Sequence, residues 1–307
     1  MSASRVDLPS DDLRGCSNAC ASTVGTPVDK DLQRSEGLAR LVLARSARGT
    51  HIADLFERSP IRIMFPGIRG APVEEAVVVN TAGGIAGGDR LEISVTVLAD
   101  ASVTVTSQAA ERVYRALSEP ALIDTRLKLR QGAQLAWLPQ ETIVYNGARM
   151  RRSTEVEISA GAEMLALEWL VLGRAAHGEE MLGGQIIDGW EVKLDGRLIW
   201  ADRFRATDDV FPRLRSPALL ADFKAIATLI YFGPDAEAWV QFIRALAPQL
   251  PCHCVTTMVS RLMIVRLAAR NAAELKAGLR EILLNFERTR TRTRARGPFR
   301  VPKMWSC

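Results

Sequence analysis

The chain has 307 residues, of which 48% are hydrophobic and 24% charged, a composition typical of a soluble globular protein. No window approaches the roughly eighteen uninterrupted apolar residues of a membrane span, so no contact with a membrane is expected. The net charge of +5 is concentrated locally, because residues 288–303 hold seven basic side chains and no acidic one. The remainder of the chain is mildly acidic.

The first thirty residues lack the apolar core of a signal peptide and scatter Asp, Ser and Gly instead. We expect residues 1–30 to be a disordered tail and residues 31–307 to form one domain, with a basic segment at 288–300. The five cysteines are an odd number and lie mostly near the ends of the chain. This usage indicates a reducing compartment and favours a cytoplasmic protein.

From about residue 38 to residue 205 the hydrophobic pattern has a period of two. Apolar and polar residues alternate along Leu91–Val97, Ile123–Leu129 and Val192–Leu194, as in strands with one buried face. Short turn signals separate these segments, and long helical windows are missing from this half. The pattern predicts a mostly β protein, built as a large antiparallel or coiled sheet assembly.

Two helices are predicted in the C-terminal half. One covers Asp235–Leu246, and the other begins after Asn271, where Glu274 completes a pattern like a capping box. Cys254–Ala269, between them, reads as strand, turn, strand. The buried stripe expected on the second helix consists of Leu275, Leu279, Ile282, Leu283 and Phe286.

A glycine-rich turn lies between two strand-like segments. The segment "NTAGGIAGGD" contains Gly83, Gly84, Gly87 and Gly88, and ends at Asp89. Glycine permits tight turns, so the segment could be a structural corner, could expose amides to an anion, or could present the carboxylate to a cation. It is not a dinucleotide-binding fingerprint, because a strand follows it and no helix dipole faces a phosphate.

Three further acids lie in or near apolar strands. Glu141 follows "LPQ", Glu168 lies inside "LEWLVLG", and Glu179 follows the corner at Gly173 and Arg174. Acids in apolar surroundings are costly unless they are paired or functional. Arg174 could pair with a carboxylate and close a loop, or several carboxylates could line one polar interior path.

Two other patterns remain open in function. "PCHC" at 251–254 could bind a metal, but no second cluster in the sequence completes the ligand set. The alternative is that the two cysteines are buried at the end of a strand and bind nothing. The alternating "ERTRTRTRARG" favours neither a stable helix nor a nucleic-acid platform, so a solvated tail or a contact for an acidic partner is expected. No nucleophile motif is present, which argues against an enzyme.

Taken in order, six segments resemble the urease accessory protein family UreD, called UreH in some organisms. They are "GGIAGGDRL", "SVTVTSQAAERVYRA", "LAWLPQETIVYNGA", "LVLGRAAHGEEM", "SRLMIVRLAA" and the closing "VPKMW". The resemblance covers about residues 38–307, and residues 1–30 have no counterpart in it.

The resemblance implies a non-catalytic chaperone with a mostly β, helicoid-like fold and a pair of helices. Such a protein bridges apo-urease to UreF and the GTPase UreG and assists insertion of Ni²⁺, without a tightly bound cofactor. It implies a nickel path through the interior, for which Asp89, Glu141, Glu168 and Glu179 are the candidate ligands on the matching motifs. Gly83, Gly84, Gly87, Gly88, Gly173 and Arg174 are then structural turn residues.

The alternative is a β module that binds an anion or nucleic acid through the glycine turn and the arginine strip. Nucleic-acid binding of that kind would depend steeply on salt.

Overall fold

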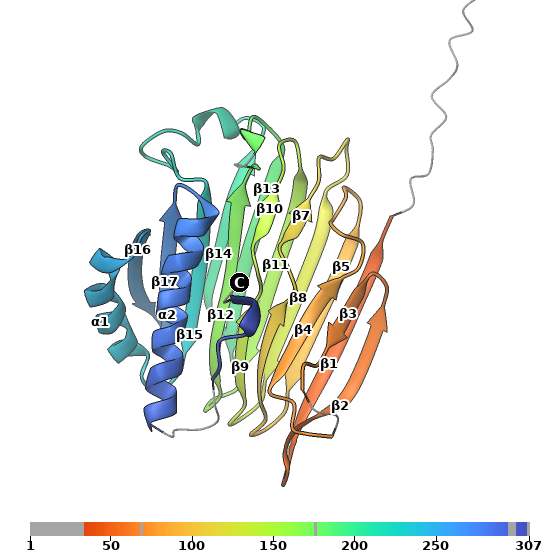
Figure 1. The fold of residues 1–307 in the computed structure, drawn as a ribbon, viewed down its shortest axis with the longest axis vertical. Coiled ribbons are helices and arrows are strands. Elements are labelled where there is room, and N and C mark those ends of the chain that lie inside the picture. The colour runs from red at the N-terminus through yellow and green to blue at the C-terminus, as the bar shows by residue number, and fades with distance from the viewer. Residues whose placement is uncertain (1–33, 68–69, 175–176, 294–298, 306–307) are drawn as a thin grey trace, which may run out of the picture. The chain divides into compact units, whose positions relative to one another are not determined.

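A computed structural model of the chain describes residues 34–67, 70–174, 177–293 and 299–305 (Figure 1). The predicted tail at residues 1–30 lies outside the described residues. The mostly β fold predicted from the alternating pattern is confirmed, as are both helices.

In the described chain, seven strands form one sheet, which we call the first sheet. Their order is β14 (Arg197–Thr207), β13 (Gln185–Leu194), β11 (Arg149–Ile158), β8 (Ala121–Leu129), β5 (Arg90–Val97), β1 (Glu36–Ser46) and β2 (Gly49–Arg58). The predicted strands at 91–97, 123–129 and 192–194 are all members of this sheet.

The second sheet runs, over the described residues, from β16 to β3. Its order is β16 (His253–Val259), β17 (Leu262–Ala269), β15 (Ala225–Phe232), β12 (Glu163–Leu172), β9 (Gln134–Leu138), β6 (Ser102–Ser107), β4 (Glu75–Asn80) and β3 (Ile61–Met64). The short strands β7 (Glu111–Val113) and β10 (Thr142–Val144) pair with each other, and β10 also pairs with β12.

The middle of both sheets is parallel. Between β4 and β13 the chain passes alternately through the two sheets, so each strand is paired in parallel with the one from the next coil. Parallel neighbours normally need a helical crossover. Here the strand of the opposite sheet makes that return, which explains why this half of the sequence lacks helical windows.

Strand β12 is buried along its whole length because both of its faces are covered. Met164, Ala166 and Leu170 belong to the core between the two sheets, whereas Leu165, Leu167 and Trp169 belong to a second core under the helices. Continuous burial gives a strand that reads as an unbroken apolar run. Glu168 shares the face of Ala166 and Leu170, and so points toward the first sheet.

The helices cover the outer face of the second sheet near β15 and β17 (Figure 1). α1 spans Ala236–Leu246 and buries Trp239 and Ile243. α2 spans Ala272–Thr293, and the Glu274 amide donates to Asn271 Oδ1 over 2.9 Å, which confirms the predicted cap. The five residues predicted for its buried stripe are all buried.

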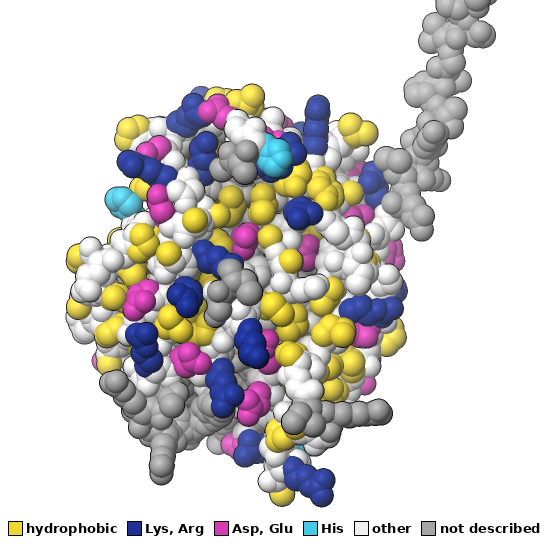
Figure 2. All heavy atoms as spheres, viewed as in Figure 1, with side chains coloured by type: hydrophobic (Ala, Val, Ile, Leu, Met, Phe, Trp, Pro, Cys, Tyr) yellow, Lys and Arg dark blue, Asp and Glu magenta, His cyan; other side chains and the backbone are white. Residues whose placement is uncertain are grey.

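The prediction that the arginine–threonine run does not form a stable helix is wrong for residues 288–293, where α2 continues to Thr293. Helix nucleation is the costly step, and once the buried stripe has fixed the first turns each further residue adds a hydrogen bond. Arg288 also lies 3.9 Å from Glu281 on the same helix. Elsewhere on the face drawn in Figure 2, basic and acidic side chains are scattered among one another.

The C-terminal segment returns to the second sheet. Trp305 is fully buried, donates its indole N–H to the Leu138 carbonyl over 3.1 Å, and packs 5.8 Å from the Trp169 ring. The described end of the chain is therefore anchored by one aromatic side chain on the outer face of β9 and β12.

Replacing Trp305 by Ala should lower the free energy of unfolding by about 3–5 kcal/mol, because a large buried ring and its hydrogen bond are both lost. Trp305→Phe should cost less, since most of the ring volume remains. Urea titration of both variants against wild type measures the difference. Equal stability of Trp305→Ala and wild type would contradict the anchoring role.

Candidate functional site

A charged cluster lies in the core between the two sheets. Arg152 comes from β11 and Asp188 from β13 of the first sheet, and Glu168 from β12 of the second. The exposed fractions of their side chains are 4%, 12% and 5%, respectively. Each is on the inward face of its strand because the alternation places it in phase with buried apolar neighbours.

The guanidinium of Arg152 joins both carboxylates. Its Nη1 lies 2.6 Å from Glu168 Oε2, while Nε and Nη2 donate to the two oxygens of Asp188 over 2.8 and 2.7 Å. Nη1 also donates to the Thr142 hydroxyl over 3.0 Å, and Trp137 donates its indole N–H to Glu168 over 2.9 Å. The paired geometry with Asp188 is the strong, bidentate kind.

The cluster has one cation for two carboxylates. Burial raises the pKa of Glu168 above its usual 4.5; Arg152 opposes this shift, and the nearby Asp188 charge adds to it. Burial alone would lower the pKa of Arg152, but Asp188 and Glu168 raise it, so the guanidinium stays charged. Of the two carboxylates, Glu168 is the one whose pKa is shifted toward the protonated form.

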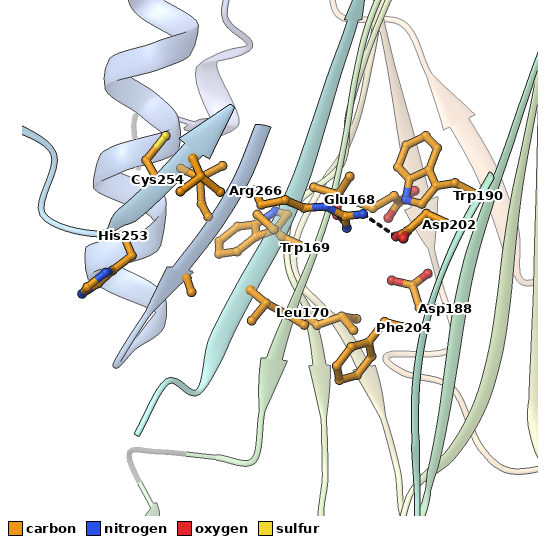
Figure 3. A pocket seen from close by; sticks show the side chains of 16 residues that line it. Glu168, Trp169, Leu170, Asp188, Trp190, Asp202, Phe204, His253, Cys254 and Arg266 are labelled. Atoms are coloured by element: carbon orange, nitrogen blue, oxygen red, sulfur yellow. Dashed lines mark hydrogen bonds and ion pairs between the residues drawn. The ribbon is translucent and has the colours of Figure 1, made fainter. Parts of the chain in front are cut away.

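Glu168 borders two cavities. The larger, of about 270 Å³, is also lined by Asp188, Asp202, His253 and Arg266, whose guanidinium lies 2.7 Å from Asp202 (Figure 3). The smaller, of about 60 Å³, lies on the other side of Glu168. It is lined by Arg152, Glu111, Gln140 and Thr142, among others.

The smaller cavity carries further polar groups. Burial raises the pKa of Glu111, although a hydrogen bond from the Asn80 amide, 3.0 Å long, partly lowers it. The side-chain nitrogen of Gln140 is buried and has no hydrogen-bond partner within the described part of the chain. An unpaired buried N–H donor beside a cavity is a group that a water molecule can satisfy.

A second network of contacts connects the glycine turn with the segments that contain Tyr114, Tyr145 and Arg174. Tyr114 donates its hydroxyl to the Gly83 carbonyl over 2.9 Å and meets the Tyr145 ring edge-on at 5.3 Å. A side chain at Gly84 would collide with Tyr114, so that glycine is required by close approach. Arg174 lies over Tyr145 at 4.5 Å.

Arg174 also pairs with Glu179. Two of its guanidinium nitrogens donate to the two oxygens of Glu179, each over 3.0 Å, and this hydrogen bonding lowers the pKa of Glu179. The geometry matches the reading in which an arginine–carboxylate pair closes the loop after Gly173. Glu179 borders a different cavity from Glu168.

Asp89 shapes the glycine turn. It is buried, and its two oxygens accept the amides of Ser35 and Ala86, each over 2.8 Å. Gly88, directly before it, has φ +88°, which favours glycine. Glu141 is half-buried between β9 and β10, and its carbonyl accepts the Glu111 amide over 2.8 Å. The structure thus places the four candidate acids in separate surroundings.

Among the residues that the structure describes, no three His, Cys, Asp or Glu side chains lie close enough to hold a metal ion. Cys252 and Cys254 are free, and burial raises their pKa to about 11 and about 12. Thiols of this kind are protonated at neutral pH and are poor metal ligands. No described helix has the length and apolar character needed to cross a membrane.

Arg152 and Asp188 were missed by the reading of the sequence. The available signal was their position in the alternation. Arg152 lies two residues from both Met150 and Thr154, and Asp188 two residues from both Ile186 and Trp190, so each shares the inward face with these neighbours. A charged residue in phase with a buried face marks a paired or functional group.

Comparison with known proteins identifies the family. The sequence profile described as "UreD urease accessory protein" matches residues 35–306. The chain belongs to the UreD family. The urease accessory protein UreD of Xanthobacter autotrophicus is 41% identical over 254 residues, covering 83% of this chain and 87% of that protein.

Other relatives span nearly the same region. UreD of a Methylobacterium species is 37% identical over 267 residues, which cover 85% of this chain and 94% of that protein. UreD 1 of Brucella abortus is 35% identical over 278 residues, which cover 90% and 95%. Membership in the UreD family implies a role in the maturation of urease.

Replacing Arg152 by Met should lower the free energy of unfolding by about 3–5 kcal/mol, because two carboxylates then lie buried without their cation. Combining Arg152→Met with Glu168→Gln and Asp188→Asn should restore much of that loss. Urea titration checks both. If the triple variant is as unstable as the single one, the loss comes from packing and the electrostatic explanation is wrong.

The raised pKa of Glu168 also predicts a pH dependence. The Glu168 carboxyl group binds a proton more tightly in the folded protein than in the unfolded chain, so protonation of Glu168 stabilises the fold. That contribution to the free energy of unfolding is complete below pH 4.5 and is lost as the pH rises through the raised pKa. Glu168→Gln cannot titrate, so its free energy of unfolding should lack that decline, by about 1.4 kcal/mol for each unit of pKa. Urea titrations over a pH series measure the difference.

The control for this experiment is Glu157→Gln, which alters an exposed ion pair with Lys128. Its stability should follow the wild-type pH curve. Parallel curves for Glu168→Gln and wild type would rule out a raised pKa at Glu168.

Proposed function

We propose that this protein is a cytoplasmic, non-catalytic chaperone of urease maturation. In this role it bridges apo-urease to UreF and the GTPase UreG, and assists transfer of Ni²⁺ to the urease active site. Membership in the UreD family and the names of its relatives support the role in maturation. The named partners and the nickel transfer are the part that we propose.

The observation that carries the nickel proposal is the position of Glu168 between two cavities. Carboxylates line the space on both sides: Asp188 and Asp202 in the larger cavity, Glu111 in the smaller. Ni²⁺ accepts oxygen and nitrogen ligands. We propose that the ion passes between the sheets along this series, with Glu168 as the step that joins the two spaces.

The electrostatics of the cluster favour transit over capture. Arg152 neutralises one of its two carboxylates, so the cluster attracts one further positive charge. A divalent cation that reaches Glu168 competes with the guanidinium of Arg152 for the same carboxylate. Such competition weakens binding, and weak binding allows the ion to move on.

The other three candidate acids have supporting roles in this proposal. Asp89 holds the glycine turn and Glu179 holds the loop after Arg174, while Glu141 lies beside Glu111 at the junction of β9 and β10. The turn does not favour the anion-binding alternative, because the amide of Ala86 already donates to Asp89.

Replacing Glu168 by Gln in a urease-producing host should reduce the nickel content of purified urease to a minor fraction of the wild-type content. The physical reason is that a neutral amide removes the charge that joins the two cavities. The measurement is nickel per urease active site by mass spectrometry, with co-purification of urease and the accessory proteins as a check on assembly.

Glu157→Gln is the matched control, because it removes one carboxylate from the exposed ion pair with Lys128. Urease from that host should carry the wild-type amount of nickel. Full nickel loading with Glu168→Gln, in an assembled complex, would exclude Glu168 from the path. Full loading in a host that lacks the whole chain would overturn the proposed function itself.

A further inference from the structure

One row of residues crosses five neighbouring strands of the first sheet. Strand register makes each residue the partner of the next: Arg90 on β5, Leu122 on β8, Arg151 on β11, Ile187 on β13 and Arg205 on β14. We call these five residues the arginine row. Arginine and an apolar residue alternate along it.

The arginine row lies on the outer face of the sheet. The neighbours of its members along each strand are buried, including Leu91, Arg152 and Ala206. Since side chains alternate between the faces of a strand, the row points away from the core. Its three arginines are exposed, and Leu122 and Ile187 are half-buried between them.

The row differs from its surroundings in charge pairing. Elsewhere on this face, cross-strand ion pairs join Arg126 to Glu92 and Lys128 to Glu157. In the described part of the chain, the three arginines of the row make no such pair, although Arg205 is near enough to Asp209 to contribute to the lowering of its pKa. A fourth exposed arginine, Arg203, lies on the adjacent row beside Gly189.

The spacing of the row selects the shape of a partner. Adjacent strands are about 4.8 Å apart, so successive arginines are separated by about 9.6 Å, with an apolar residue midway. An α-helix rises about 10.5 Å in seven residues and about 5 Å in three or four. A helix laid across the strands can therefore place an acid over each arginine and an apolar residue over Leu122 and Ile187.

An extended peptide fits less well. Its side chains return to one face every second residue, or about 6.7 Å, which does not match a spacing of 9.6 Å. We propose that the arginine row is a docking site for an amphipathic helix of a partner protein, with acidic residues one heptad apart and apolar residues between them. The identity of that partner as a member of the maturation assembly rests on the proposed function, whereas the chemistry of the row does not.

The proposal is tested with the full chain and a fluorescent helical peptide of about three heptads, which has Glu once in each heptad and Leu midway. Fluorescence anisotropy gives its affinity. The double variant Arg151→Glu/Arg205→Glu should weaken binding by roughly tenfold or more, because two attractions become repulsions. A peptide of the same composition in scrambled order should bind the wild-type chain comparably weakly.

Lys128→Glu/Lys193→Glu is the matched control, with the same change of charge on the same face but off the row. Its affinity for the peptide should stay within about twofold of wild type. A second variant, Ile187→Lys, should also weaken binding, although it adds a positive charge. Circular dichroism and thermal unfolding establish that all variants fold.

Equal losses in the row and control variants, or equal binding of the ordered and scrambled peptides, would overturn the proposal. Tighter binding of a DNA duplex than of the peptide, lost in the row variant, would make the row a nucleic-acid site instead. Because this assay contains no urease, its outcome is independent of the nickel content that tests the proposed function.

Discussion

The guanidinium of Arg152, shared between Glu168 and Asp188, is the interaction on which the centre of the fold depends. It joins the first sheet to the second between side chains that are almost entirely buried, with exposed fractions of 4% for Arg152, 5% for Glu168 and 12% for Asp188. Strand β12 is covered on both faces, so Glu168 has no outward position to turn to. The cluster also fixes register, because a slip of one residue along β11 would put Arg151 inside and Arg152 outside. Buried ion pairs contribute little net stability, but breaking one is costly. Their effect here is that the native register of the two sheets has a much lower free energy than a register shifted by one residue.

The same cluster supports our proposal that cations pass through the interior without being held tightly. With one cation for two carboxylates, burial raises the pKa of Glu168, and the pKa of Glu111, which lines the smaller cavity, is raised in the same direction. Tight nickel or zinc sites instead use thiolates or several imidazoles held together. The thiols of Cys252 and Cys254 remain protonated, with pKa values of about 11 and about 12. Among the described residues, these thiols do not provide a closed cage, which agrees with the proposed path of oxygen ligands met one after another.

Local patterns in the sequence predicted the strands and both helices because they depend on neighbouring residues. Alternation marked Leu91–Val97 and Ile123–Leu129, and the Asn271–Glu274 spacing marked the start of α2. The parallel order of the coil was not determined by such patterns, since alternation shows which face is buried but not which strand lies alongside. The end of α2 was misjudged because propagation from a docked helix outweighed the local preference of the Thr residues. Arg152 and Asp188 were missed because their importance comes from partners 16 to 36 residues away.

The residues of the family motifs have two different roles in the structure, and the sequence alone could not distinguish them. Gly84, Tyr114, Tyr145 and Arg174 contact one another in sequence, and these contacts fix together the segments that follow four different strands, β4, β7, β10 and β12. Asp89 and Glu179 belong to this group, because their oxygens are already occupied by amides and a guanidinium. Glu168 belongs to the other kind, since it shares Arg152 with Asp188 and lines two cavities. In the sequence all three acids look alike, as carboxylates beside apolar strands. What separates them is how the charge is balanced, because Glu168 shares its one cation, Arg152, with a second carboxylate, Asp188.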